Sequence, residues 1–370
     1  ERCAAFFALG IAQQTKKPTA IVCTAGSALL NYYPAVAEAF YSQIPLIVIS
    51  ADRPQSKIDI GDGQTIRQEN VFQNHSVFNA NLVEEASVEN DLKINKAIET
   101  AILQKGPVHI NAPFEEPLYE TVTALSVNPK ITYSDEILGT KLIENEAEFV
   151  SIWNQAKRKL VLVGVNEANT IDNAIIESFA RDPSIVVLTE TTSNLHHPSF
   201  INSIDTLITP FDDSDFKDFE PEILVTFGGM IVSKRIKAFL RKYKPQHHWH
   251  IDTLRAYDTF SALTQHFVMQ PNDFFNALLS KTIFTESNYF SQINSIYELR
   301  KVRRNEYVEK IPFSDFKVFE KVIESLPENS QLQISNSSAI RYAQLIDIDN
   351  SIEVFCNRGT SGIDGSTSTA

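Results

Sequence analysis

The sequence predicts an α/β protein built on parallel sheets, and three observations support this fold class. Short runs rich in Val, Ile and Leu recur along the chain, and most are apolar throughout. Such runs are typical of strands that are buried on both faces of a sheet. Segments with helical spacing of apolar residues separate them, and turn-forming residues bound most of them. The alternation of strand and helix favours doubly wound, Rossmann-like sheets with helices on both faces.

The predicted strands are short and end at turn residues. They cover Thr19–Thr24, Pro45–Ser50, Val108–Asn111, Lys159–Val165, Ser184–Thr189, Glu222–Phe227, His247–Ile251, Gln331–Ser335 and Ile352–Cys356. The predicted helices share apolar residues three and four positions apart. They cover Glu1–Gln14, Ser27–Ser42, Asn90–Leu103, Ala147–Arg158, Ile171–Ala180 and Lys234–Leu240. We also expect a helical connector over 285–310, because Phe290, Ile293 and Ile296 lie on one face.

These elements group into three predicted domains, over 1–125, 146–282 and 312–370. The stretch 120–145 is rich in Thr, Ser, Asn and Pro and predicts an interdomain linker. The chain starts without Met inside a predicted helix and ends directly after a glycine-rich loop. We therefore expect an internal fragment of a longer protein, in which the first domain lacks its N-terminal part and the third is truncated.

Composition limits the class of protein. The 370 residues include 33 Lys and Arg against 46 Asp and Glu, a net charge of −13, which argues against nucleic acid or an anionic membrane as the main partner. No apolar run approaches the roughly 18–20 residues that span a bilayer. The cysteines, Cys3, Cys23 and Cys356, are too scattered for a disulfide framework or a zinc site. We expect a reduced protein of the cytoplasm.

Three arginines are the main candidates for ligand binding. Ligands of open α/β sheets bind beyond the carboxyl ends of the strands, and Arg53, Arg341 and Arg358 each follow a predicted strand. The planar guanidinium pairs bidentately with carboxylates and phosphates. Together they predict an anionic, polycarboxylate ligand. The alternative, in which each arginine pairs with a neighbouring Asp, stays open.

Ser337 and Arg341 have the spacing of a shared site. Ser337 is a suitable helix N-cap, and Arg341 lies one turn further on the same face. Both side chains could then address one ligand at the positive end of the helix. A plain capped helix with a surface arginine explains the same residues.

Other features carry weaker signals. The loop Gly359-x-x-Gly362-x-x-Gly365 and the small-residue turn 23–27 allow close backbone approach to a cofactor, but neither matches a dinucleotide or P-loop pattern. Glu1 opens a strongly apolar segment, so we expect its carboxyl group to be poorly solvated and suited to proton relay; an ordinary helix start is the alternative. We do not expect the histidines at 196–197 and 247–250 to bind a metal, since no further ligand stands at a compatible spacing.

Several longer motifs resemble one family. They are Glu1-Arg2-x-Ala4-Ala5-Phe6-Phe7-Ala8-Leu9-Gly10, Asn31-Tyr32-Tyr33-Pro34-Ala35, Ala51-Asp52-Arg53-Pro54, Gln64-Thr65-Ile66-Arg67-Gln68, His109-Ile110-Asn111 with Pro113 to Tyr119, Ser233-Lys234-Arg235 and Asn357-Arg358-Gly359-x-Ser361-Gly362-Ile363-Asp364-Gly365. They are similar to thiamine diphosphate enzymes. More narrowly, they resemble the transferases that make 2-succinyl-5-enolpyruvyl-6-hydroxy-3-cyclohexene-1-carboxylate in menaquinone biosynthesis. The matches are dense in 1–120 and 331–370.

The resemblance implies a fold, a cofactor and a reaction. The three domains would be the pyrimidine-binding, central and diphosphate-binding domains. With thiamine diphosphate and Mg²⁺ or Mn²⁺, 2-oxoglutarate would lose CO₂ and its four-carbon remainder would be added to isochorismate. The active enzyme would be a homodimer or homotetramer, because active sites in this family combine domains of two subunits.

The resemblance also implies residue roles. Glu1 would be catalytic and hold the aminopyrimidine of the cofactor, and Ile363 would support the bent cofactor. Arg53, Gln64 and Lys234 would receive isochorismate. Ser337, Arg341 and Arg358 would hold the 2-oxoglutarate carboxylate and the group derived from it, with Ser337 also next to the cofactor. No residue is expected to bind the metal, whose ligands would follow Ala370, so we expect residues 1–370 alone to be inactive.

Other readings remain open beside this resemblance. Another thiamine diphosphate enzyme that acts on a 2-oxo acid is one, although a small monocarboxylate needs fewer cationic partners than three arginines. A catalytically inactive ligand-binding protein of the same fold is another. A nicotinamide enzyme is more distant, because no strand leads into Gly-x-Gly-x-x-Gly.

Overall fold

The computed structural model describes residues 1–115, 119, 121–132 and 143–370, which belong to two compact units. One unit comprises Glu1–Leu138 with Asn357–Ala370, and the other comprises Gly139–Cys356. Residues 116–118 of the Pro113–Tyr119 motif and 133–142 of the predicted linker lie outside the described residues. The three predicted domain boundaries remain a prediction.

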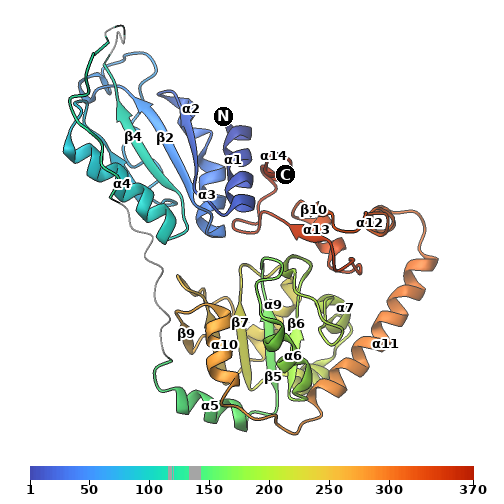
Figure 1. Cartoon of the computed structure of the whole chain (residues 1–370). Helices are drawn as coiled ribbons and strands as arrows, with labels where there is room; N and C mark the ends of the chain where they lie inside the picture. Colours follow the sequence, from blue (N-terminus) through green and yellow to red (C-terminus); the bar gives the residue numbers. More distant parts are fainter. Residues whose placement is uncertain (116–118, 120, 133–142) are drawn as a thin grey trace. The chain divides into compact units, whose positions relative to one another are not determined.

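The first unit contains a parallel sheet with the strand order β1-β2-β4-β3. Its central strands β2 and β4 lie side by side (Figure 1). Its strands are β1 (Thr19–Cys23), β2 (Leu46–Asp52), β3 (Phe78–Asn81) and β4 (Val108–Pro113). Its helices are α1 (Arg2–Thr15), α2 (Ser27–Leu30), α3 (Tyr33–Ser42), α4 (Val88–Leu103) and α14 (Ser366–Thr369), with a 3₁₀ turn over Gln55–Lys57. The single helix predicted over Ser27–Ser42 is divided into α2 and α3, since Pro34 sits in the first turn of a new helix.

Two apolar cores cover the two faces of this sheet. Leu46 and Val48 pack with α1 and α3, whereas Ile47 packs with Ala97 and Ala101 of α4. Successive side chains of a strand point to opposite faces, so a strand buried on both faces is apolar throughout. This packing explains the continuous apolar run of β2, and it confirms the predicted sheet with helices on both faces.

The segment 357–370 packs on α1 within the first unit. Two glycines allow this close contact. A Cβ at Gly365, whose φ is 70°, would lie 2.2 Å from Cγ of Phe6, and a Cβ at Gly10 would lie 2.1 Å from the Thr369 carbonyl oxygen. Any larger residue at either position would push the segment away from α1.

The second unit contains the parallel sheet β6-β5-β7-β8-β9 and a two-stranded parallel sheet, β10-β11. The strands are β5 (Lys159–Val163), β6 (Ile185–Leu188), β7 (Ile223–Phe227), β8 (His247–Ile251), β9 (Gln265–Phe267), β10 (Gln331–Gln333) and β11 (Glu353–Phe355). The helices are α5 (Glu146–Gln155), α6 (Asn173–Arg181), α7 (Ile204–Ile208), α8 (Asp213–Phe219), α9 (Lys234–Lys242), α10 (Pro271–Leu279), α11 (Tyr289–Lys310), α12 (Asp315–Glu324) and α13 (Ser338–Ala343), with a 3₁₀ turn over Thr191–Ser193.

Helices cover both faces of the five-stranded sheet. Trp153 of α5, Phe179 of α6 and Phe274 of α10 pack on one face. Residues of α7, α9 and α11 pack on the other. The α/β class with Rossmann-like parallel sheets is therefore confirmed. The strands β3 and β9 were not predicted, because both are short and carry polar residues.

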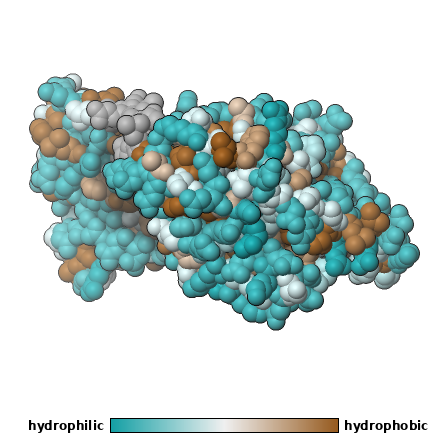
Figure 2. All heavy atoms as spheres, turned by 90° about the horizontal axis from the view of Figure 1, so that it is seen from below, coloured by the Kyte–Doolittle hydropathy of each residue, from teal (hydrophilic) through white to brown (hydrophobic). Residues whose placement is uncertain are grey.

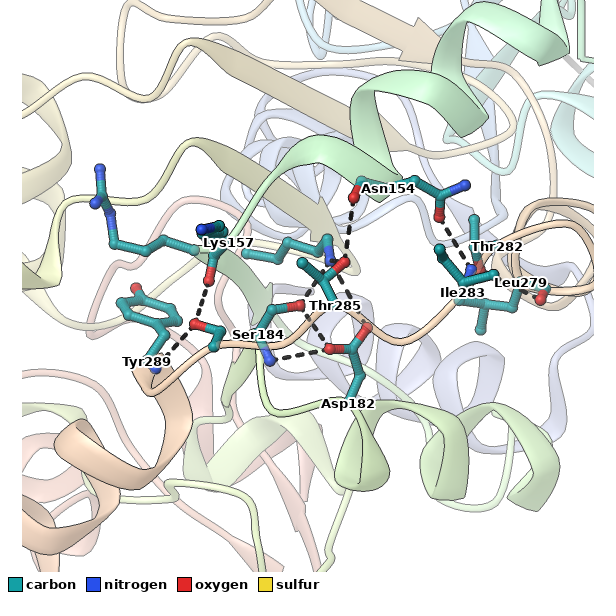
Figure 3. A network of polar contacts seen from close by, with 12 residues as sticks. Asn154, Lys157, Asp182, Ser184, Leu279, Thr282, Ile283, Thr285 and Tyr289 are labelled. Carbon is teal, nitrogen blue, oxygen red and sulfur yellow. Dashed lines mark hydrogen bonds and ion pairs between the residues drawn. The ribbon is translucent and has the colours of Figure 1, made fainter.

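A polar network crosses the amino-terminal edge of the five-stranded sheet (Figure 3). The ammonium group of Lys159, which is 0% exposed, lies 3.7 Å from the Asp182 carboxylate, and donates hydrogen bonds to Ser184 Oγ at 2.6 Å and Thr285 Oγ1 at 3.1 Å. Asp182 also accepts hydrogen bonds from the backbone and hydroxyl groups of Ser184. These donors and acceptors satisfy a charge pair that is removed from water.

Figure 2 shows a face of the molecule that is mainly hydrophilic, with hydrophobic residues in separate groups. Such scattered groups are normal for a folded chain. None of the described helices is both long enough and apolar enough to cross a bilayer.

Candidate functional site

The residues predicted to form the site are divided between the two units. The first unit contains Glu1, Arg53, Gln64, Arg358 and Ile363, and the second contains Lys234, Ser337 and Arg341.

Arg53 and Gln64 meet beyond the carboxyl end of β2. Arg53 donates a hydrogen bond from Nη2 to Gln64 Oε1 at 3.3 Å, and its backbone N–H donates to Asp52 Oδ1 at 2.8 Å. The other Asp52 oxygen accepts from Asn111 Nδ2, at 2.7 Å, at the end of β4. Asp52 thus fixes the backbone at Arg53, and the structure brings together two residues predicted for one ligand.

A buried glutamine connects the loops that surround this position. Gln68 Oε1 accepts from the Gly26 N–H at 2.7 Å, and its Nε2 donates to the Ala51 carbonyl at 2.8 Å and to Asn111 Oδ1 at 3.0 Å. Because Gly26 has a φ of 90°, the turn after β1 takes a path that favours glycine. The turn and the ends of β2 and β4 therefore form one hydrogen-bonded edge.

Glu1 lies at the start of α1, near this edge. Burial, together with the nearby Glu1 carboxylate, raises the pKa of Cys23 to about 11. Burial likewise raises the pKa of Tyr32 to about 12, with the charges of Cys23 and Glu1 adding to the effect. The Glu1 side chain is exposed and makes no capping hydrogen bond. The expected poor solvation of Glu1 is wrong for this structure, because the apolar residues of α1 turn toward the sheet and Glu1 does not.

The surroundings of Glu1 suit a thiamine ring. Arg2 pairs with Asp364 at 3.6 Å, which brings the segment around Ile363 next to the start of α1. Ile363 is 77% exposed. An acceptor carboxylate and an accessible aliphatic side chain, beside a glycine turn, fit a flat heterocycle that donates hydrogen bonds from its edge. The described residues therefore fit the aminopyrimidine part of thiamine diphosphate.

Lys234 and Arg341 line one cavity in the second unit. Its volume is about 190 Å³, and its walls come from α7, the α9 start and α13. The lining residues are Ile204, Asp205, Val232, Ser233, Lys234, Arg235, Arg341 and Gln344. Three cationic side chains and one carboxylate make this cavity suitable for an anionic ligand. The structure thus joins Lys234 with Arg341, which the sequence had assigned separately.

Ser337 is outside the lining of this cavity. It is the N-cap residue of α13, as predicted, but its exposed hydroxyl makes no capping hydrogen bond. Its backbone has φ 66° and ψ −129°, a conformation that residues other than glycine rarely adopt. Because the Ser337 hydroxyl does not cap the helix, it is available to bind a ligand.

The residues that position this cavity were not predicted from the sequence. Glu190 is buried and accepts hydrogen bonds from the backbone N–H groups of Val232 and Ser233, at 2.6 Å and 2.7 Å. Ser233 Oγ accepts from the Ile236 N–H and donates to Asp205. Glu190 follows a predicted strand, so the rule that singled out the arginines could also have found it.

The histidine segment in β8 has a structural explanation. His248 and His250 point to the same face, as predicted for a strand, and both contact Thr226 Oγ1, at 2.9 Å and 2.8 Å. Burial lowers the pKa of His248 to about 4. Within the described residues, no group of three or more His, Cys, Asp or Glu side chains could hold a metal.

Comparison with known proteins identifies the class. The family model of the thiamine pyrophosphate enzyme, N-terminal TPP binding domain, matches residues 1–80, where Glu1, Arg53 and Gln64 lie. The model of the middle domain of thiamine pyrophosphate matches residues 135–334. Thiamine pyrophosphate is the same compound as thiamine diphosphate. The chain thus has the fold of a thiamine diphosphate enzyme.

Curated relatives narrow this class. Proteins named 2-succinyl-5-enolpyruvyl-6-hydroxy-3-cyclohexene-1-carboxylate synthase are 83% identical in Flavobacterium johnsoniae, 67% in Flavobacterium psychrophilum and 52% in Christiangramia forsetii. Each match covers 100% of this chain, and 67%, 67% and 68% of the respective relatives. This chain belongs to that synthase family.

Proposed function

We propose that the enzyme uses thiamine diphosphate to convert 2-oxoglutarate and isochorismate into 2-succinyl-5-enolpyruvyl-6-hydroxy-3-cyclohexene-1-carboxylate and CO₂, a step of menaquinone biosynthesis. The observation that carries this proposal is the 83% identity with a synthase of that name over the whole of this chain. The three cationic side chains at the cavity of the second unit support it, because both substrates are anionic.

The roles of Glu1 and Ile363 follow from their positions. When bound, the cofactor supplies the means of cleaving the bond to the carboxylate group that leaves as CO₂. Glu1 would accept a hydrogen bond from the ring edge and hold a proton there, and Ile363 would give the cofactor an apolar contact. Both side chains are exposed, which leaves them accessible to a cofactor and supports this assignment.

The remaining predicted residues would bind the two substrates. Arg53, Gln64 and Lys234 would receive isochorismate, and Ser337, Arg341 and Arg358 would hold 2-oxoglutarate, with Ser337 also beside the cofactor. The Arg53–Gln64 hydrogen bond supports the first group, and the position of Arg341 in the cavity supports the second. Since Lys234 lines the same cavity as Arg341, it suits the place where the four-carbon unit reaches isochorismate.

The proposal includes a divalent metal, a subunit arrangement and a location. Mg²⁺ or Mn²⁺ would neutralise the diphosphate, although no described residue is assigned to it. A homodimer or homotetramer is supported by the exposed apolar side chains Phe7 and Ile11 on one face of α1. The reduced thiols of Cys3, Cys23 and Cys356 support a cytoplasmic location.

The proposal is tested by CO₂ release from 2-oxoglutarate by the native enzyme, with thiamine diphosphate and Mg²⁺, in the presence and absence of isochorismate. We expect release to depend on isochorismate and to be lost in Glu1→Gln, which keeps the size of the side chain but not its charge. Release from pyruvate instead would contradict the assigned substrate. No release with either 2-oxo acid would contradict the enzyme assignment.

A further inference from the structure

Glu38 is a buried carboxylate that has no role in the site described above. It lies in α3, is 2% exposed, and faces the segment 357–370 of the same unit. A carboxylate removed from water is costly unless hydrogen-bond donors satisfy its oxygens. The hydrogen-bond donors around Glu38 therefore show which segment its carboxylate fixes in place.

Four hydrogen bonds end on the Glu38 carboxylate. Oε1 accepts from the Gly359 N–H at 2.7 Å and from Ser42 Oγ at 2.8 Å. Oε2 accepts from the Thr360 N–H at 2.8 Å and from the Thr360 hydroxyl at 2.7 Å. Three of these four come from the loop after β11, and bonds to a charged acceptor are stronger than neutral ones.

The loop also lies directly on α3. A Cβ at Gly359 would be 2.6 Å from Ser42 Oγ and 2.7 Å from the Glu38 carbonyl oxygen. Only glycine lets the backbone come this close. The carboxylate and the glycine together fix the path of the loop at two consecutive residues.

We propose that Glu38 is a positioning residue of the active site. Gly359 follows Arg358, and Thr360 precedes Ile363 by three residues, so the contact with Glu38 lies between two candidate site residues. By holding the backbone here, Glu38 keeps the Arg358 guanidinium group and the Ile363 side chain in place before the ligands arrive. The inference rests on the proposed roles of Arg358 and Ile363.

The first test measures the loop without using activity. Arg358 is buried, so trypsin can cut the Arg358–Gly359 bond in the native enzyme only when the loop leaves α3. Peptides that begin at Gly359 are quantified by mass spectrometry over time. We expect Glu38→Gln to increase this cleavage by about 10- to 100-fold, because the amide replaces an acceptor with a donor that faces N–H groups.

Two further variants provide reference rates of trypsin cleavage. Thr360→Val removes one loop hydrogen bond and keeps the shape of the side chain, so we expect an intermediate increase. Ser42→Ala removes the one bond that does not come from the loop, so we expect cleavage within about twofold of the parent rate. If Glu38→Gln fails to fold, the comparison of Thr360→Val with Ser42→Ala still decides the question.

The second test measures substrate binding. We expect Glu38→Gln to raise the KM for 2-oxoglutarate by about tenfold and to change kcat less, because the Arg358 guanidinium group is no longer fixed. Parent-like cleavage in Glu38→Gln would overturn the inference, and so would faster cleavage with an unchanged KM. A parent enzyme without synthase activity would instead overturn the proposed function, while the trypsin result would still show whether Glu38 holds the loop.

Discussion

The Glu190 carboxylate accepts a hydrogen bond from the backbone N–H of Ser233 at 2.7 Å, directly before the cavity residue Lys234. Glu190 follows β6, and the segment it holds leads into α9. The same short turn also binds α13, because the Thr191 N–H donates to Gln344 Oε1 at 3.3 Å. One buried turn therefore supports the two elements that carry Lys234 and Arg341.

We predict that Glu190→Gln loosens Lys234. The single amide oxygen of Gln can accept in place of only one of the two carboxylate oxygens that bind the Val232 and Ser233 N–H groups. We therefore expect a loss of about 2–4 kcal/mol of stability. We also expect a several-fold rise in the KM for isochorismate and a smaller change in kcat. Urea denaturation and steady-state kinetics of the native enzyme measure the two effects.

The matched control is Glu320→Gln. Glu320 is a buried helical carboxylate that pairs with Lys317 at 2.9 Å and is not part of the cavity lining. It should lose stability without a change in the KM for isochorismate. An equal change of KM in both variants would show that Glu190 affects binding only through general stability.

We predict that replacing Ser337 by Gly raises stability and lowers activity. Its φ of 66° suits glycine, so we expect Ser337→Gly to gain about 1 kcal/mol of stability, as relief of backbone strain exceeds the added entropy of the unfolded chain. Activity should fall, because the variant lacks the Ser337 hydroxyl, which is proposed to contact a ligand. Thermal unfolding and the rate of CO₂ release measure the two effects.

Ser338→Gly is the control for this prediction. Ser338 is the next residue and lies inside α13, where glycine costs up to about 1 kcal/mol. We expect this variant to lose stability and retain activity. A loss of stability in Ser337→Gly would mean that its backbone conformation carries no strain.

The fold was predictable because central strands such as β2, β5 and β7 are largely buried on both faces. In β5, Leu160 and Leu162 face one core while Val161 and Val163 face the other, which produces the continuous apolar run seen in the sequence. β3 and β9 are sheet edges with polar residues, so they lack this signal. Burial on both faces thus gave the clearest signal, whereas a short polar edge strand gave none.

The candidate site was predictable only where a local rule applied. Arg53 and Arg341 follow strands; Arg53 donates a hydrogen bond to Gln64, and Arg341 lines the same cavity as Lys234. Glu38 lies within an ordinary helical pattern, and its loop partners are more than 320 residues away in the chain. Contacts of that kind leave no mark on local sequence, so the supporting residues became visible only in the structure.

His109 predicts a pH dependence of stability. Burial lowers its pKa from the usual 6.5 to about 4. Between these values the unfolded chain binds a proton that the folded chain does not, so stability is fully present above pH 6.5 and is lost as the pH falls toward 4. We expect a loss of about 2 kcal/mol from this group between pH 7.5 and pH 5.

The variant His109→Gln tests this pH dependence. It cannot titrate, so its free energy of unfolding should fall less between pH 7.5 and pH 5 than that of the parent, as measured by urea denaturation. His248→Gln, in the other unit, should remove a similar part, since burial lowers that pKa to about 4 as well. Parallel pH profiles for the parent and His109→Gln would contradict the assigned shift.

Lys159 and Asp182 predict a strong energetic coupling. Both side chains are buried, and removal of one partner from a buried charge pair costs about 3–5 kcal/mol. We therefore expect Lys159→Met and Asp182→Asn each to destabilise the protein by about this amount. Asp182→Asn should also lower the pKa of Lys159 further, because burial already lowers it and the opposing carboxylate is then lost.

The double variant separates charge pairing from packing. If the loss arises mainly from an unpaired buried charge, Lys159→Met with Asp182→Asn should be less destabilised than the sum of the single variants, by at least about 1 kcal/mol in urea denaturation. Additive losses would show that the two groups act independently. This network lies at the amino ends of β5 and β6, whereas the cavity lies beyond the carboxyl ends of strands in the same sheet. The KM values of all three variants should therefore match that of the parent at temperatures where they are folded.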